Sequence, residues 1–245
     1  MIILDNIHKS FNGQPVLKGV SLKVKDGETL VIVGPSGTGK SVTLKHMLGL
    51  LTPDEGKVMI DGEEMVRTTG RSAEKLRDKF GVLFQSGALI NWLSVGDNVA
   101  LPLIEKTKWK DAEIKERVSR VLSMVEMDGT EFKMPAEISG GMKKRAGLAR
   151  AIVLEPTILL YDEPTSGLDP LLSRKIDKLI MNLSKTLAVT SVVVTHDMVS
   201  AFSIADRIVM LHGGKVIEEG TPEEFRRSTN PFVKEFIDAQ FKYEK

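Results

Sequence analysis

One stretch decides the fold of this chain: Leu30-Val31-Ile32-Val33-Gly34-Pro35-Ser36-Gly37-Thr38-Gly39-Lys40-Ser41. Its apolar start predicts a buried strand, and a helix is expected from Gly39 to about Leu48. Glycines let backbone N–H groups turn inward around an anion, and the N-terminus of a helix favours negative charge. The spacing Gly34-x-x-x-x-Gly39-Lys40-Ser41 between strand and helix therefore indicates a loop that binds phosphates.

Short apolar runs alternate with helical patterns along most of the remaining chain. The runs of strand length are residues 2–33 in several pieces, Lys57–Ile60, Thr157–Tyr161 and Ser191–Thr195. Residues 86–138 differ, because they contain a predicted helix over 111–127 with apolar residues at helical spacing. This alternation predicts an α/β fold with a largely parallel core sheet.

We expect a single domain over residues 1–245. Its core would combine residues 1–85 and 141–245, with a helical subdomain inserted over 86–140 and a helical tail over 221–245. The tail begins at Thr221-Pro222-Glu223-Glu224, which has the cap, proline and returning glutamate of a helix start.

Composition excludes several classes of protein. The formal net charge is +1 and no basic stripe is present, so nucleic acid is not an expected partner. The chain has no cysteine, which excludes a disulfide framework and thiolate metal sites. No apolar run approaches the roughly 20 residues that cross a bilayer, and no export signal is expected. Action on a membrane would therefore need another chain.

Two acids follow the apolar run Ile158-Leu159-Leu160-Tyr161. Successive side chains of a strand point in opposite directions, so Asp162 and Glu163 should have different roles. Asp162 would support Mg²⁺, and Glu163 would act as the base for an attacking water or would orient it. Such a pair in isolation is more often a solvated turn, but the glycine loop favours the catalytic interpretation.

Two further polar residues follow predicted strands. Gln85 comes directly after Gly81-Val82-Leu83-Phe84, and its amide could contact Mg²⁺ and the attacking water. His196 comes directly after Ser191–Thr195 and could hydrogen-bond a γ-phosphate. The alternatives are an ordinary loop amide and a structural histidine.

These motifs occur in the order that is characteristic of ABC ATPases. The set comprises the glycine loop, Gln85, Ser139-Gly140-Gly141, Asp162-Glu163, Ser166-Gly167-Leu168-Asp169 and His196. The chain resembles this family over nearly its whole length. The resemblance implies a P-loop NTPase fold with a mixed or parallel core sheet, an N-terminal antiparallel β subdomain and an inserted helical subdomain. ATP and Mg²⁺ would be the cofactors, with Ser41, Gln85 and Asp162 around the metal.

The resemblance also implies a homodimer that encloses two nucleotides. Ser139, Gly140 and Gly141 would offer a hydroxyl and backbone N–H groups to the γ-phosphate held by the opposite subunit. Asp169 would lie at the dimer seam. Phe11 matches the aromatic residue that stacks on adenine, although plain core packing is the alternative for a single Phe.

One position departs from the family pattern. The signature usually ends in Gln, whereas this chain has Met142, which offers no amide donors. We still expect hydrolysis, because Ser139 and both glycines remain. The stretch from Ile138 to Ala151, with Met142-Lys143-Lys144-Arg145 at its centre, resembles the Mla/Mce branch of phospholipid-transport ATPases.

Membership of that branch would imply particular partners and a particular location. These are an integral membrane permease, an Mce-domain lipid-binding protein and a small STAS-type regulator, at the cytoplasmic face of the inner membrane. Leu89, Trp92 and Leu93 would offer an exposed apolar groove to a permease helix. The charge run Lys143-Lys144-Arg145 is expected to be a solvated helix face.

Other functions stay open at this point. The motifs cannot distinguish phospholipid from another solute, because none of them touches the cargo. A soluble ABC-type ATPase acting on DNA or ribosomes is a further alternative, although the single cassette and the short insertion argue against it. A protein that binds ATP without turnover is another, which Glu163 and His196 disfavour.

Overall fold

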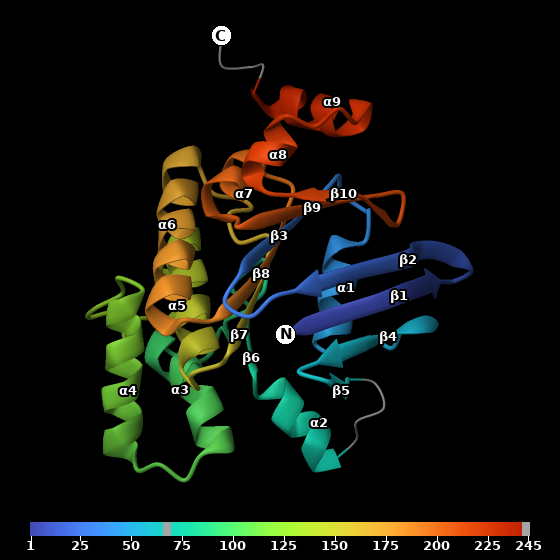
Figure 1. Cartoon of the computed structure of the whole chain (residues 1–245). Coiled ribbons are helices and arrows are strands. Elements are labelled where there is room, and N and C mark those ends of the chain that lie inside the picture. Colours follow the sequence, from blue (N-terminus) through green and yellow to red (C-terminus); the bar gives the residue numbers. More distant parts are fainter. Residues whose placement is uncertain (66–69, 242–245) are drawn as a thin grey trace. The chain divides into compact units, whose positions relative to one another are not determined.

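The computed structural model describes residues 1–65 and 70–241. The chain divides into two compact units, Met1–Arg77 with Thr190–Lys245, and Asp78–Val189. The first unit contains β1 (Ile2–Phe11), β2 (Gln14–Val24), β3 (Thr29–Val33), α1 (Lys40–Met47), β4 (Glu55–Ile60), β5 (Glu63–Glu64), α2 (Gly70–Arg77), β8 (Thr190–Thr195), α7 (Met198–Ile204), β9 (Arg207–His212), β10 (Lys215–Gly220), α8 (Pro222–Arg226) and α9 (Pro231–Phe241) (Figure 1). The second contains β6 (Phe80–Leu83), α3 (Val95–Lys106), α4 (Asp111–Met124), the 3₁₀ turn Pro135–Glu137, α5 (Gly140–Ile152), β7 (Ile158–Asp162) and α6 (Pro170–Leu187).

The first unit is built on two groups of strands. β2, β1, β4 and β5 follow one another in this order and pair antiparallel. β3 pairs in parallel with both β8 and β9, and β10 pairs antiparallel with β9. The predicted α/β fold, with an N-terminal antiparallel sheet and a mixed core sheet, is confirmed.

The local sequence explains these strands. Asn12 and Gly13 join β1 to β2 with φ of 49° and 77°, and positive φ at both positions is what a two-residue hairpin turn requires. Every residue of β3 and of β8 is buried. Continuous apolar runs of this kind are typical of parallel strands that are covered on both faces.

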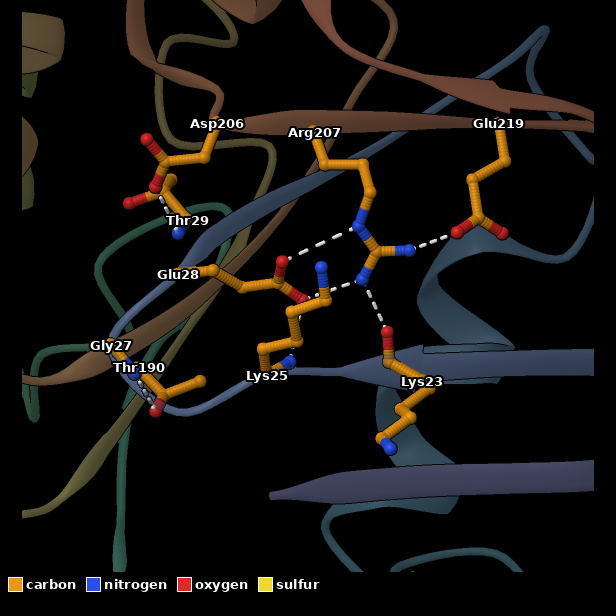
Figure 2. Close-up of polar contacts among 9 residues, drawn as sticks. All are labelled: Lys23, Lys25, Gly27, Glu28, Thr29, Thr190, Asp206, Arg207 and Glu219. Carbon is orange, nitrogen blue, oxygen red and sulfur yellow. Dashed lines mark hydrogen bonds and ion pairs between the residues drawn. The ribbon is translucent and has the colours of Figure 1, made fainter.

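Arg207 is the centre of a charged network at the start of β3 (Figure 2). Its guanidinium donates to both carboxylate oxygens of Glu28, at 2.5 and 3.3 Å, and also to Glu219 and to the carbonyl of Lys23. Burial alone lowers the pKa of Arg207, but the neighbouring carboxylates outweigh it and raise that pKa above its usual value. The arginine therefore stays charged and links β9 to β2, to β10 and to the turn before β3.

The same end of β3 is held by two backbone donors. Thr29 N–H donates to the Asp206 carboxylate at 2.8 Å, and Gly27 N–H donates to Thr190 Oγ1 at 3.0 Å (Figure 2). Strands β3, β8 and β9 are thus aligned at their amino ends, which sets where their carboxyl ends lie.

The second unit places helices around a parallel pair of strands. β6 pairs with β7 in the register Phe80↔Ile158 to Leu83↔Tyr161. Helix α5 packs on β6, and α3 and α4 both pack on α5. Gly81 permits this packing, since a Cβ there would lie 2.2 Å from the Ala151 carbonyl oxygen. Within residues 1–65 and 70–241, no helix is both long and apolar enough to cross a membrane.

Some predicted boundaries move slightly. The helix predicted over 111–127 is α4, which ends at Met124 because Glu126 adopts a left-handed φ of 57°. The tail helix α8 begins as predicted, with Thr221 and Glu224 forming a reciprocal capping box. The subdomain limits at 85/86 and 140/141 stay a prediction.

Candidate functional site

The glycine loop leads from β3 into α1 in the first unit. Gly34, Gly37 and Gly39 have φ of 148°, 81° and 100°, a range that favours glycine. Space is restricted as well, because a Cβ at Gly34 would lie 2.2 Å from the Leu211 carbonyl oxygen, and one at Gly39 would lie 2.5 Å from Leu17 Cδ2. The glycine spacing noticed in the sequence therefore has both a conformational and a steric cause.

Lys40 begins α1 and lies along the inside of this loop. Its side chain is buried, and Nζ donates to the carbonyl oxygens of Gly34 at 2.8 Å and of Pro35 at 3.0 Å. Thr38 Oγ1 also donates to the Pro35 carbonyl, at 2.9 Å. Ser41 follows in the first turn of the helix and is half-buried. An ammonium group and a helix N-terminus thus lie at one loop, an arrangement that suits a polyphosphate.

His196 lies at the same edge of the sheet as the glycine loop. β3 and β8 pair in parallel with Val33 opposite Thr195, so Gly34 and His196 each follow directly after the paired ends. The side chain of His196 is exposed. It is therefore not a buried core histidine, the alternative considered from the sequence.

Phe11 ends β1 in the same unit. Its side chain is 40% exposed, so plain core packing does not describe its surroundings. Lys9 Nζ lies 5.7 Å from the centre of the ring. An exposed aromatic face is what stacking on a base requires.

Gln85, Asp162 and Glu163 lie together in the second unit. The pairing of Leu83 with Tyr161 brings the carboxyl ends of β6 and β7 to one edge. Gln85 Nε2 donates to Ser166 Oγ at 3.2 Å, which ties it to the turn after Glu163. Glu163 has a left-handed φ of 49°, uncommon for a residue other than glycine, and so the backbone changes direction directly after Asp162.

Lys144 is a component that sequence reasoning missed, and the expected solvated face for Lys143-Lys144-Arg145 is wrong at this residue. Lys144 is only 4% exposed, and its Nζ donates to the main-chain carbonyl of Glu163 at 3.1 Å. Burial lowers the pKa of Lys144, and the charge of Glu163 opposes that effect. Arg145 is also engaged, since it forms an ion pair with Glu126 at 2.7 Å.

A signal for this burial exists in the sequence. Lys144 lies three residues after Gly141 and four before Leu148, and both of those residues are buried in α5. Residues at these spacings share one face of a helix. A charged side chain on a buried face requires a partner, and here the partner is a backbone carbonyl.

Ser139, Gly140 and Gly141 form the N-terminus of α5. Ser139 is the N-cap, and its Oγ accepts from Met142 N–H at 3.3 Å. A Cβ at Gly140 would approach nothing nearer than Leu168 Cδ2, at 4.0 Å, and one at Gly141 would meet only leucine methyl groups at 3.8–4.0 Å. Packing within the chain therefore does not require glycine at either position.

The segment after Gln85 is tightly held, although one of its apolar side chains is exposed. The buried Asn98 accepts from Ile90 N–H at 2.7 Å and donates to the carbonyls of Ile90, Leu93 and Ser94. Trp92 is 80% exposed, whereas Leu89 and Leu93 are half-buried. The predicted apolar surface thus consists mainly of Trp92, and sequence reasoning missed the role of Asn98.

The predicted site residues are divided between the two units. The first unit holds Phe11, the loop from Gly34 to Ser41 and His196. The second unit holds Gln85, Asp162, Glu163 and the start of α5 from Ser139 to Gly141.

Known proteins resemble nearly the whole chain. A family model described as ABC transporter matches residues 17–166. The probable ribonucleotide transport ATP-binding protein mkl of Mycobacterium tuberculosis is 42% identical, over 98% of this chain and 67% of its own length. The intermembrane phospholipid transport system ATP-binding protein MlaF of Haemophilus influenzae is 38% identical, over 98% of this chain and 91% of its own length.

Solved structures of ATP-binding cassettes also resemble this chain. The dimeric ATP-binding cassette MJ0796, in a post-hydrolysis state bound to ADP and Pi, superposes with a TM-score of 0.83 and 36% identity. The match covers 91% of this chain and 99% of that one. The glycine loop, the acidic strand end and these similarities together show that the chain belongs to the ABC transporter family, as an ATP-hydrolysing subunit.

Proposed function

We propose that this chain hydrolyses ATP to drive a membrane permease that moves phospholipid between two membranes. The observation that carries the cargo assignment is the similarity to MlaF, a phospholipid-transport protein by name, over 91% of its length. The resemblance of Ile138–Ala151 to the Mla/Mce branch points in the same direction. The second candidate is ribonucleotide, because the mkl relative is named for that cargo and is 42% identical.

The phosphates would bind at the glycine loop. Lys40 would exchange its bonds to the Gly34 and Pro35 carbonyls for β- and γ-phosphate oxygens, while N–H groups of the loop surround the anion. Phe11 would stack on the adenine ring. The predicted ligands fit Mg²⁺ because a Ser41 hydroxyl, a Gln85 amide oxygen and an Asp162 carboxylate are all hard oxygen donors. When bound, Mg²⁺ would neutralise charge on the phosphates.

Glu163 would take the proton of the attacking water. Its backbone carbonyl accepts from the Lys144 ammonium, and its left-handed φ turns the chain directly after Asp162. Gln85 would orient the same water through its amide, while its bond to Ser166 limits how that amide can rotate. His196 would hydrogen-bond the γ-phosphate.

A second copy of the chain would complete the site. Gly140 and Gly141 are not required by packing within the chain, so we infer that they leave room for a nucleotide held by the opposite subunit. The Ser139 hydroxyl and the N–H groups of the α5 N-terminus would then face the γ-phosphate. Loss of that phosphate on hydrolysis would weaken the seam and open the dimer.

Trp92 is our candidate contact to the permease, since a side chain that is 80% exposed and aromatic suits a partner helix. An Mce-domain lipid-binding protein and a STAS-type regulator would complete the complex. This assembly would place the chain at the cytoplasmic face of the inner membrane.

Affinity purification of the tagged chain from detergent-solubilised native membranes tests the cargo. Recovery of a multi-span permease, an Mce-domain protein and phospholipid is the expected result. A permease that co-purifies with nucleotide would favour the ribonucleotide candidate, and a complex without any membrane protein would overturn the transport proposal.

Substitution of Glu163 tests the clamp. Glu163→Gln should bind ATP but not hydrolyse it, so a dimer should accumulate in ATP, visible by size-exclusion chromatography with light scattering. The same variant in ADP is the control and should elute as a monomer. A monomer at saturating ATP would contradict the shared site.

A further inference from the structure

We propose that Gln240, near the end of the C-terminal helix α9, is a positioning residue for ATP hydrolysis that acts by holding the backbone of His196. The inference rests on the proposed contact between His196 and the γ-phosphate. It assigns a task to the C-terminal helix, which carries none of the motifs found in the sequence.

One side-chain amide spans the loop after β8. Gln240 Oε1 accepts from Met198 N–H at 2.7 Å, and its Nε2 donates to the His196 carbonyl at 2.9 Å. The two backbone groups belong to the residues on either side of Asp197. A carboxamide can make both bonds, because its oxygen accepts and its nitrogen donates.

The Met198 N–H is a donor that the local cap does not reach. Asp197 caps α7 by accepting from Val199 N–H at 2.8 Å and from Ser200 N–H at 3.1 Å. Met198 begins the helix and is buried, so its N–H needs an acceptor from another part of the chain. Gln240 provides that acceptor and, with the same group, fixes the peptide that carries His196.

Aromatic contacts anchor α9 where Gln240 can make these bonds. The Phe232 ring lies 3.8 Å from the ring of His212, and the Phe241 ring lies 6.0 Å from that of Phe202. The guanidinium of Arg226 covers Phe202 at 4.1 Å. Helix α9 thus packs against α7 and α8 within the same unit (Figure 1).

The consequence concerns the geometry at the carboxyl edge of the sheet. β8 delivers His196 to the edge where Gly34 begins the glycine loop. Beyond that edge, the direction of the histidine depends on the backbone of residues 196–198, which Gln240 holds from one side. Without Gln240, the imidazole would sample positions that do not reach the γ-phosphate, and misplacement by about 1 Å can cost about 100-fold in rate.

Two substitutions separate the bonds. Gln240→Ala removes both, whereas Gln240→Glu keeps an acceptor for Met198 N–H but places an oxygen against the His196 carbonyl. Both variants should lower kcat about tenfold or more and leave KM for ATP within about twofold. Glu235→Ala, at an exposed position of the same helix, is the matched control and should behave as wild type.

Hydrogen exchange reports the bond directly, since the Met198 amide should lose protection in Gln240→Ala while the amides of β8 keep theirs. An unchanged kcat in Gln240→Ala would overturn the inference, and so would a rise in KM with kcat retained. If Gln240→Ala unfolds near the assay temperature, Gln240→Met takes its place, because methionine keeps the length of the side chain and removes both bonds.

The double variant distinguishes this inference from the proposed function. If Gln240 acts through His196, Gln240→Ala should cause no further loss in a His196→Ala background. Equal losses in both backgrounds would overturn the positioning role and leave the role of His196 intact. Wild-type turnover in His196→Ala would instead refute the γ-phosphate contact, and the inference with it.

Discussion

The two ends of strand β3 use similar chemical groups for different purposes, since the amino end stabilises the fold and the carboxyl end forms a loop for a ligand. At its amino end, Arg207, Glu28 and Asp206 satisfy charged and backbone groups within the unit (Figure 2). At its carboxyl end, glycines with positive φ and the Lys40 ammonium form a loop that suits a ligand. In parallel sheets, ligands bind beyond the carboxyl ends of strands. The amino end is therefore free to be optimised for stability alone.

Lys40→Ala should have the largest effect and should affect function only. Removal of the ammonium should lower ATP turnover about 1,000-fold, because a positioned charge at a phosphate contributes several kcal/mol to the transition state. The free energy of unfolding should change far less than it does for the amino-end variant below. A phosphate-release assay and urea denaturation measure the two quantities. Unchanged hydrolysis would refute the assigned phosphate site.

Arg207→Met should show the converse behaviour. Glu28 would stay largely buried without its partner, so the free energy of unfolding should fall by about 3 kcal/mol, toward the lower end for a broken buried pair. Loss of the ion pair with Glu219 adds little to this decrease, because the Glu219 carboxylate is 41% exposed. Turnover per folded molecule should stay within about twofold of wild type.

The double variant Glu28→Gln with Arg207→Met serves as the control for that experiment. It removes the unpaired carboxylate and should recover much of the lost stability, as measured by urea denaturation. If Arg207→Met lost turnover and kept its stability, the division of labour between the two ends of β3 would be contradicted.

Lys144→Met sharpens the comparison, because Lys144 is a largely buried cation like Arg207 but holds the backbone of the proposed catalytic base, Glu163. Turnover should fall about tenfold as Glu163 loses its anchor, whereas stability should change little, since a buried charge is removed with its bond. Lys143→Met, at a half-buried neighbour, is the matched control.

The lowered pKa of Lys144 determines how its contribution to stability changes with pH. Its folded pKa is lowered, so just below its ordinary value of 10.5 the unfolded chain binds more protons than the folded one. The contribution of Lys144 to stability therefore rises with pH in the window between the folded pKa and 10.5. Lys144→Met should remove that rise, which denaturation curves in this alkaline range measure. If the free energies of unfolding of wild type and variant changed with pH in parallel, the burial of the ammonium would be contradicted.

Local patterns predicted the parts of the site that depend on local structure. The strand before Gly34, the helix after Lys40 and the capping box at Thr221 each follow from residues that are neighbours in sequence. The apolar run Ile158–Tyr161 likewise predicted that Asp162 and Glu163 lie at a strand end.

Contacts between distant residues could not be predicted in this way. Arg207 and Glu28 are 179 residues apart, and Gln240 and His196 are 44 apart. Such pairs depend on strand register and on where a helix packs, and neither leaves a periodic signal in one sequence. Lys144 is an intermediate case, because its helical spacing to Gly141 and Leu148 was visible but its carbonyl partner was not.

His46 gives the smallest expected effect and concerns the helix that follows the glycine loop. It is fully buried in α1, with Nδ1 2.7 Å from the Val42 carbonyl. Burial lowers the pKa of His46, and the charge of Lys9 adds to that effect, whereas the Val42 bond and Asp54 oppose it. The helix behind the phosphate loop thus behaves as core, like the amino end of β3.

The lowered pKa of His46 determines how stability changes as the pH falls. As pH falls below 6.5, the unfolded chain binds a proton that the folded chain does not, so stability falls until the folded pKa is reached and then levels off. The slope is at most about 1.4 kcal/mol per pH unit. His46→Leu should remove this slope, whereas His8→Gln, at a half-buried histidine of β1, should keep it. Urea denaturation between pH 5 and 7.5 measures the difference, and an equal acid loss in His46→Leu would show that groups outside α1 control it.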